Sequence, residues 1–408
     1  MAAKRVDLSA AWAGHAEDWR HPAQAITQWH GAGDLDPALL RYRATKKWWD
    51  VLEAAQITLL VTREYEHLVV ALAVVDGAPR VSSLPLAHPS GIAADQLTGR
   101  VHIASTRNPN QVFELAPVED VLPRADSWAR PVTGPVLTPM SSRMYPGALY
   151  IHDLAVVDGR LLANAVGQNA VVHLDRQGGL EPVWWPKAID SPVGPRFDAN
   201  VLQLNSIAAG DDLESSYFTA SAASPGRYRP GHPRFPVDGC GVLFSGKTRD
   251  VVASGLTRPH SARLHGGDVW VCNSGYGELG RVRDGAFEPV WRLRGWTRGL
   301  AFAGDHVFVA TSRVIPRFKQ YAPGLDVNAS LCAIHAIDLA RGEIVAHLTW
   351  PSGNQIFAID WLPVSLAHGL PFRGRTRHPS KAETNFFYTF RPQGTSGQLQ
   401  KDRNGKRI

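Results

Sequence analysis

The sequence has no long apolar stretch and little that would direct it to a membrane. No window approaches the roughly 18 consecutive apolar residues that a membrane-spanning helix requires. Residues 1–20 are interrupted by charges and lack the apolar segment of a signal peptide. We therefore expect a cytoplasmic protein that has no membrane partner.

Cysteine is also scarce, because the 408 residues include only Cys240, Cys272 and Cys332. Three widely separated cysteines exclude a disulfide framework and a paired-cysteine zinc knuckle. Positive charge is not concentrated either: the net charge is +6, and the one compact basic run lies at residues 401–407. Because nucleic-acid recognition needs a basic stripe or patch, we expect no nucleic-acid partner.

Nucleotide-binding and hydrolase motifs are missing as well. The chain has no P-loop, no GxGxxG and no GxSxG in a strand–turn–helix context. Their absence argues against a kinase, a dinucleotide-dependent enzyme and an α/β-hydrolase, and it predicts that no organic cofactor is bound.

Short apolar runs separated by turns make up most of the chain. The 37 glycines and 29 prolines favour many short strands over long helices. Six runs share one pattern, in which a polar residue and a small residue precede an apolar strand. These runs are PSGIAAD (89), IHDLAVVDG (151), LNSIAAGDD (204), PHSARLHGG (259), TRGLAFAGD (297) and QIFAIDW (355). Their spacing is close to the roughly 40–50 residues of one β-propeller blade.

The repeat predicts an all-β protein, a six-bladed β-propeller. Further apolar runs follow each inner strand, as a four-stranded antiparallel blade requires. The sixth blade lacks outer strands after Gln355, and strands at 57, 67 and 80 can supply them, so both chain ends close the ring. We expect an N-terminal helical extension at residues 1–56, the propeller at 57–365, and a partly mobile C-terminal extension at 366–408.

Several of these motifs resemble one known family. They are YIHDLAV (150), LNSIA (204), GLTRPHSARLHGGDVWVCNSGYGELGRV (255) and WTRGLAF (296). Together they resemble an uncharacterised bacterial family, a domain of unknown function expected to form six-bladed propellers. The resemblance covers about residues 45–365 and implies the fold and the location of a site, but no reaction. The architecture is more remotely similar to gluconolactonase-like and strictosidine-synthase-like propellers.

The propeller geometry predicts a ring of polar side chains around the axis. The innermost strand of each blade begins near the axis, and the turn between the second and third strands lies at the same face. The inner-strand starts contribute Ser90, His152, Asn205, His260 and Arg298. The turns contribute Arg107, Asn164, Asn273, Glu278 and Arg313.

The two axial histidines allow three interpretations. His152, His260 and the intervening Asn205 could bind one divalent metal ion, with zinc, iron or copper favoured over calcium by nitrogen ligands. The imidazoles could instead act as acid and base without a metal. They could also only hydrogen-bond neighbouring blades.

The remaining candidates suit an anionic ligand. Arg298, Arg313 and Arg107 match carboxylate or phosphate groups, and Asn164, Asn273 and Ser90 would add hydrogen bonds to the substrate. Glu278, held among glycines, and Tyr276 are candidates for proton transfer, beside the roles of turn cap and packing.

These candidates favour a small-molecule enzyme of lyase, isomerase or hydrolase type that acts on a polar, anionic substrate. The alternative is a propeller that binds a ligand or a protein without catalysis. The sequence does not specify an oligomeric state.

Overall fold

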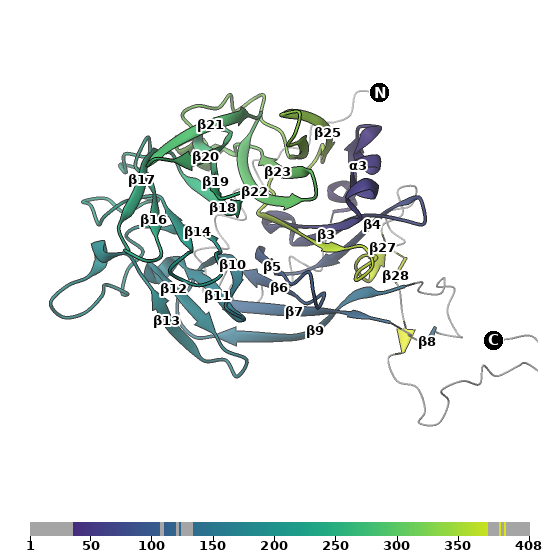
Figure 1. Ribbon diagram of the computed structural model, residues 1–408, viewed down its shortest axis with the longest axis horizontal. Helices are drawn as coiled ribbons and strands as arrows, with labels where there is room; N and C mark the ends of the chain where they lie inside the picture. Colours follow the sequence, from purple (N-terminus) through teal and green to yellow (C-terminus); the bar gives the residue numbers. More distant parts are fainter. Residues whose placement is uncertain are drawn as a thin grey trace, which may run out of the picture.

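A computed structural model describes residues 36–106, 110–119 and 134–371, together with the backbone of four short strands at 122–123, 372–373, 383–384 and 387–388. The fold is the expected six-bladed β-propeller (Figure 1). The innermost strands contact one another in the closed order β5, β10, β14, β18, β22, β26 and back to β5.

Three blades are built from four consecutive strands, a fourth leaves out one short strand between its third and outermost strands, and a fifth adds one short N-terminal strand. From the axis outward these five blades are β5 (Pro89–Ala94), β6 (Val101–Ser105), β7 (Asn110–Val118) and β9 (Val136–Tyr145); β10 (Ile151–Val157), β11 (Arg160–Ala165), β12 (Ala170–Leu174) and β13 (Leu180–Trp184); β14 (Leu204–Ala208), β15 (Tyr217–Ala220), β16 (Gly241–Ser245) and β17 (Val251–Leu256); β18 (Pro259–His265), β19 (Asp268–Asn273), β20 (Glu278–Arg283) and β21 (Ala286–Arg292); and β22 (Trp296–Ala303), β23 (His306–Ser312), β24 (Ala333–Asp338), β25 (Glu343–Thr349) and β1 (Arg43–Ala44).

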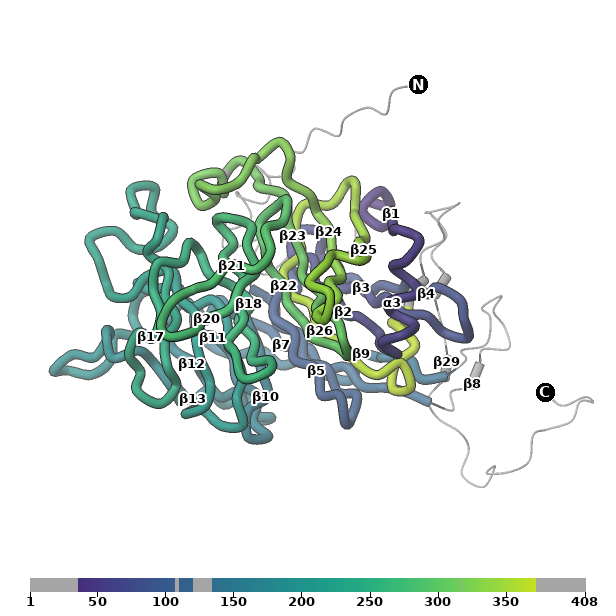
Figure 2. Tube along the Cα trace, turned by 45° about the horizontal axis from the view of Figure 1, so that its top comes forward, coloured from purple at the N-terminus to yellow at the C-terminus, as the bar shows by residue number. Residues whose placement is uncertain are grey.

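The sixth blade closes the ring with strands from both parts of the chain, as the sequence predicts. Its inner strand β26 (Ala358–Pro363) pairs with β2 (Ile57–Arg63), which pairs with β3 (Leu68–Val75) and β4 (Ala78–Pro85). The β2–β26 register runs from Ile57 opposite Pro363 to Thr62 opposite Ala358. Figure 2 shows these early and late segments side by side. Short strands add to the edges: β27 (Phe372–Arg373) and β28 (Glu383–Thr384) extend this blade, and β8 (Leu122–Pro123) pairs with β29 (Phe387–Tyr388).

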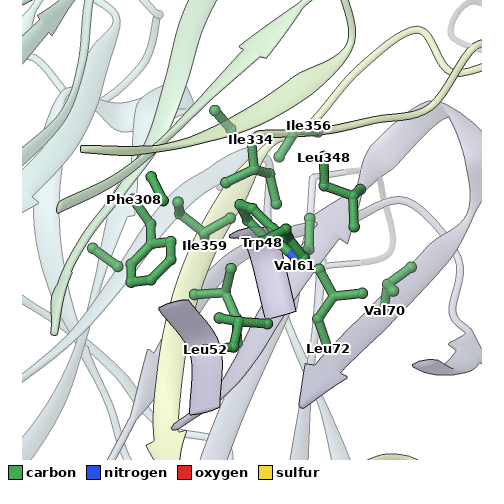
Figure 3. Close-up of a cluster of buried hydrophobic side chains, with 14 of the residues drawn as sticks. Trp48, Leu52, Val61, Val70, Leu72, Phe308, Ile334, Leu348, Ile356 and Ile359 are labelled. Atoms are coloured by element: carbon green, nitrogen blue, oxygen red, sulfur yellow. The ribbon is translucent and has the colours of Figure 1, made fainter. Parts of the chain in front are cut away.

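The predicted N-terminal helix lies over the seam between the fifth and sixth blades. It is α3 (Lys47–Ala55), which lies within the expected helical extension at residues 1–56, and it follows a 3₁₀ turn, η1 (Pro37–Leu40). Trp48 and Leu52 on one face of α3 are fully buried. They pack among side chains of both blades, including Val61, Leu348 and Ile359 (Figure 3). The part of the expected extension at residues 1–35 and the tail from 374 onward, including the basic run, fall largely outside the described residues.

The inner strands share a local distortion at the position of the polar ring. In five blades the register of the inner strand shifts by a bulge near its start, for example between Ile151 and Leu154 and between His260 and Arg263. Four residues that immediately precede an inner strand have a left-handed backbone conformation, although none of them is glycine. They are His88, Tyr150, Gln203 and Arg258, with φ between 45° and 57°. Such residues are uncommon and cluster at functional sites.

The described residues contain no helix long and apolar enough to span a membrane. The cysteines are unpaired, and Cys272 and Cys332 are buried. Burial raises the pKa of each of these two thiols to about 12, so they are packing residues rather than nucleophiles.

Candidate functional site

Three of the predicted ring residues meet at the propeller axis. His152 on β10 and His260 on β18 come from blades separated by one blade, yet their ring centroids are 6.4 Å apart and the planes are tilted by 29°. Asn205 starts the intervening blade, and its side-chain amide donates to the Pro259 carbonyl and to the Ser221 hydroxyl, both at 3.0 Å. The expected convergence of these three side chains is therefore present.

The hydrogen bonds of His260 define its tautomer. Its Nδ1 lies 2.9 Å from the Arg258 carbonyl, which can only accept, so Nδ1 carries the proton and Nε2 holds a lone pair. The Ser274 hydroxyl also lies 2.9 Å from Nδ1. Burial holds the pKa of His260 well below the usual histidine value, and the charge of Arg298 lowers it further. The imidazole is therefore neutral, with a fixed orientation.

His152 has a similar environment. Burial lowers the pKa of His152 well below the usual value, Arg298 adds to the effect, and Asn205 opposes it. Its Nδ1 is buried and has no hydrogen-bond partner in the described part of the chain. The ring packs edge-on against Tyr150, at 4.8 Å, and Phe357, at 5.5 Å.

Arg298 is a buried cation beside both imidazoles. Its side chain comes from β22 and lies over the Phe357 ring, with 3.2 Å from Cζ to the ring centroid. The residue is only 7% exposed, and burial lowers the pKa of its guanidinium to about 10, which leaves it charged at neutral pH. Among the described residues Arg298 forms no ion pair, and its Nη2 is buried without a hydrogen-bond partner. An unsatisfied buried guanidinium carries a large free-energy cost unless a ligand or water meets it.

Arg258 is a second buried cation, and the sequence interpretation missed it. It precedes β18, is 4% exposed, and lies over the Tyr321 ring at 4.0 Å. Its Nη1 donates to neutral acceptors, the Gln203 carboxamide at 2.5 Å and the Ser221 hydroxyl at 3.1 Å. Burial lowers the pKa of Arg258 to about 10. No ion pair involves it in the described ranges, so it is charged and uncompensated there.

One carboxylate of the closing blade acts on Arg298. Glu64 is in η2 (Glu64–Glu66), the turn between the second and third strands of the closing blade, and it is the foremost negative charge acting on Arg298. Its Oε1 accepts from the Thr106 hydroxyl at 2.7 Å and lies 3.9 Å from Nδ1 of His88. The His88 ring packs against His67 at 4.2 Å. The sequence pattern did not predict a role for Glu64. The available signal was a short polar segment at residues 64–67, in which three polar residues flank one tyrosine.

Several predicted ligand contacts instead hold the blades together. The Ser90 hydroxyl is buried between the Ala104 and Ile151 carbonyls, each at 3.0 Å. Asn273 accepts from the Thr257 amide at 2.7 Å and donates to Glu278 at 2.9 Å. These side chains are therefore already used, and the structure pairs Glu278 with Asn273 rather than with His260.

Other candidates lie away from the imidazoles or are engaged elsewhere. The Tyr276 hydroxyl binds Asp238 at 3.0 Å, which raises the pKa of that phenol. Arg313 donates to the Gly353 and Pro351 carbonyls at 2.9 and 3.0 Å. Asn164 is fully buried opposite the bulge of β10, and neither carboxamide atom has a partner within the described ranges, so it remains available. Arg107 lies outside the described residues.

The donor set does not fit the predicted metal ion. The described residues contain no group of three His, Cys, Asp or Glu side chains that could hold a cation. The two imidazoles lie beside two guanidinium groups, whose positive charge opposes a divalent cation. Asp153, which follows His152 in the sequence, is engaged by Arg263 at 2.9 Å and by the Ile207 amide at 3.0 Å. The cluster therefore suits an anion better than a metal.

Solved structures with similar architecture differ widely in sequence. A nidogen/laminin complex chain has a TM-score of 0.49 and 11% identity, covering 76% of this chain and 100% of its own length. A gluconolactonase from Xanthomonas campestris has a TM-score of 0.42 and 13% identity, with 73% and 86% covered. A streptogramin B lyase has a TM-score of 0.36 and 13% identity, with 62% and 72% covered. No curated protein matches the sequence. A family model matches residues 46–368, and the chain therefore belongs to the family described as a domain of unknown function, DUF4915.

Proposed function

We propose that the protein is a small-molecule enzyme of lyase, isomerase or hydrolase type that binds an organic anion at the propeller axis. The observation that carries the proposal is the pair of buried guanidinium groups, Arg258 and Arg298, without an ion pair in the described chain and next to the lone pair of His260. A bound carboxylate would supply the missing counter-charge and hydrogen-bond acceptors.

The same arrangement suits acid–base chemistry. His260 Nε2 would take a proton from the carbon next to the bound carboxylate, or from water. The electron pair left on the ligand would be stabilised by the two guanidinium charges. His152, Asn205 and Asn164 would position the ligand through hydrogen bonds. Besides burial, the two cations lower the pKa of His260, so a bound anion would raise that pKa and make the imidazole a better base.

The proposal is tested first by binding. Thermal unfolding and titration calorimetry would be measured with acetate, benzoate, gluconate and inorganic phosphate at equal ionic strength. We expect at least one of these anions to stabilise the wild type, and Arg298→Gln to weaken its affinity about 10- to 100-fold, the usual range for losing a charged hydrogen bond. Arg294→Gln, which removes an exposed charge just before β22, should bind normally.

Catalysis is tested with a mixture of metabolite anions followed by mass spectrometry. The wild type should consume one component that His260→Gln leaves unchanged while still binding it. Anion binding without turnover would favour the non-catalytic alternative. Absence of any Arg298-dependent binding would remove the proposal.

A further inference from the structure

An aromatic ring lies against each of the two guanidinium groups. We infer that the ligand of this site is an organic anion with a single negative charge and a planar, apolar body, as in an aromatic carboxylate. This inference rests on the proposed function and narrows its substrate class.

The charge balance of the site favours one negative charge. Arg258 and Arg298 bring two positive charges, while His152 and His260 are neutral. Glu64 offsets one positive charge on the side of Arg298. The other carboxylates of this region have partners, since Glu66 lies 3.5 Å from Arg63 and Asp153 pairs with Arg263. Counted over the described residues, one positive charge is left for the ligand.

Both guanidinium groups and both imidazoles of the cluster contact an aromatic ring. Phe357 lies against both Arg298 and His152, and Tyr150 covers the other edge of His152. Trp296 lies 5.8 Å from the His260 ring, and Tyr321 lies 4.0 Å from the Arg258 guanidinium. Each cation therefore has one planar aromatic surface against it, beside the polar contacts of Arg258 to Gln203 and Ser221.

The aromatic surface continues into the loop between β23 and β24. Its 3₁₀ helix η6 (Pro316–Tyr321) places Phe318 against Trp296 at 6.2 Å and against Tyr65 at 6.4 Å, both in stacked geometry. Phe318 also packs against Tyr321 at 6.1 Å. These rings join the two sides of the cluster, from η2 of the sixth blade to the fifth blade.

The buried side-chain atoms of the cluster that lack a hydrogen-bond partner among the described residues include Nε of Arg258, Nη2 of Arg298, Nδ1 of His152, Oδ1 of Asn205 and both carboxamide atoms of Asn164. The two guanidinium nitrogens suit a carboxylate, which leaves the atoms of the imidazole and the two carboxamides for other polar groups of a ligand. A sugar acid brings several hydroxyl groups, and each one buried without a partner lowers affinity. An aromatic ring instead gains from stacking and from guanidinium–π contact. The lining thus favours an aromatic carboxylate over a sugar acid.

The experiment is a ranking of probes on the wild-type chain by titration calorimetry. Benzoate and phenylacetate would be compared with acetate, gluconate and inorganic phosphate at equal ionic strength. We expect the aromatic carboxylates to bind about tenfold or more tightly than acetate, as one added aromatic contact allows. Gluconate and phosphate should bind no more tightly than acetate.

Matched tryptophan variants locate the preference. Trp296→Leu should reduce the ratio of benzoate to acetate affinity, whereas Trp291→Leu, on the outer strand of the fourth blade, should leave it unchanged. Equal affinities for benzoate and acetate, or tighter binding of gluconate, would overturn this inference. The proposed function would still be supported in that case if binding depended on Arg298. Loss of all anion binding would remove both. The ranking of the probes on the wild type tests the preference for aromatic carboxylates even where a variant does not fold.

Discussion

Charged residues on the inner strands form a second group that is separate from the anion site. Arg263 on β18 binds both carboxylate oxygens of Asp153, at 2.9 and 3.3 Å, and its charge also acts on Asp360 of β26. Asp360 accepts from the amides of Ala94 and Trp361, each at 2.9 Å. One half-buried cation, Arg263, thus acts on carboxyl groups of two other blades, so the protonation of these carboxyl groups depends on the ring being closed.

Asp360 should make folding stability depend on pH. Burial raises the pKa of Asp360 to about 6, although the Ala94 amide and Arg263 oppose the shift. Since the folded state holds this proton more tightly than the unfolded chain, with its pKa near about 4, the contribution of Asp360 to the free energy of unfolding falls as pH rises from about 4 to about 6.

Asp360→Asn should remove this decrease in the free energy of unfolding between about pH 4 and about pH 6. Urea unfolding of the variant and the wild type across this pH range would measure the difference. Asp305→Asn, at an exposed position, is the matched control. An unchanged pH profile in Asp360→Asn would contradict the assignment.

At the scale of elements, the inner strands were predictable because their polar residues recur with the blade repeat. His152, Asn205, His260 and Arg298 occupy equivalent positions, so the repeat alone placed them around the axis. Arg258 was missed because it contributes through a left-handed backbone just before its strand, with φ 55°, which the hydrophobic pattern does not report.

Contacts made by loops explain why other predicted site residues do not reach the axis. Tyr276 is held by Asp238, and Arg313 is held by the carbonyls of the segment that leads to β26. The course of such loops depends on tertiary packing and has no counterpart in the repeat. The strands that close the ring, by contrast, were predictable. The sixth inner strand is not followed by further strands in the sequence, so its partners must come from elsewhere in the chain.

The helix α3 should stabilise the seam where the ring closes. Trp48 is fully buried, packs edge-on against Phe308 at 6.1 Å, and its indole nitrogen has no hydrogen-bond partner among the described residues. Trp48→Ala should lower the free energy of unfolding by about 3–5 kcal/mol, as for other large buried aromatics. Trp48→Phe should cost much less because it keeps most of the packing and removes the unpaired N–H. Urea unfolding measures both, and Trp49→Ala, at a half-buried neighbour, is the comparison. Equal losses for Ala and Phe would show that packing is not the cause.

At the scale of the whole molecule, the segment that closes the ring also completes the anion site. Phe357 lies just before β26 and contacts both His152 and Arg298, so the site cannot form until the last blade has paired with β2. The Thr62 hydroxyl reinforces the junction by accepting from the Ala358 amide at 3.0 Å and donating to the Ser90 carbonyl at 2.6 Å. Closure and ligand binding should therefore be coupled.

A chain that ends at Pro351 should lose anion-dependent thermal stabilisation, and an added peptide of residues 352–373 should restore it by pairing with β2. The same peptide with Phe357→Ala should restore the stability of the truncated chain more fully than it restores anion affinity, because strand pairing is retained while the ring beneath Arg298 is removed. A chain that ends at Arg373 controls for loss of the tail. Thermal unfolding with and without benzoate or acetate separates the two effects. Undiminished anion binding by the chain ending at Pro351 would show that the site is independent of closure.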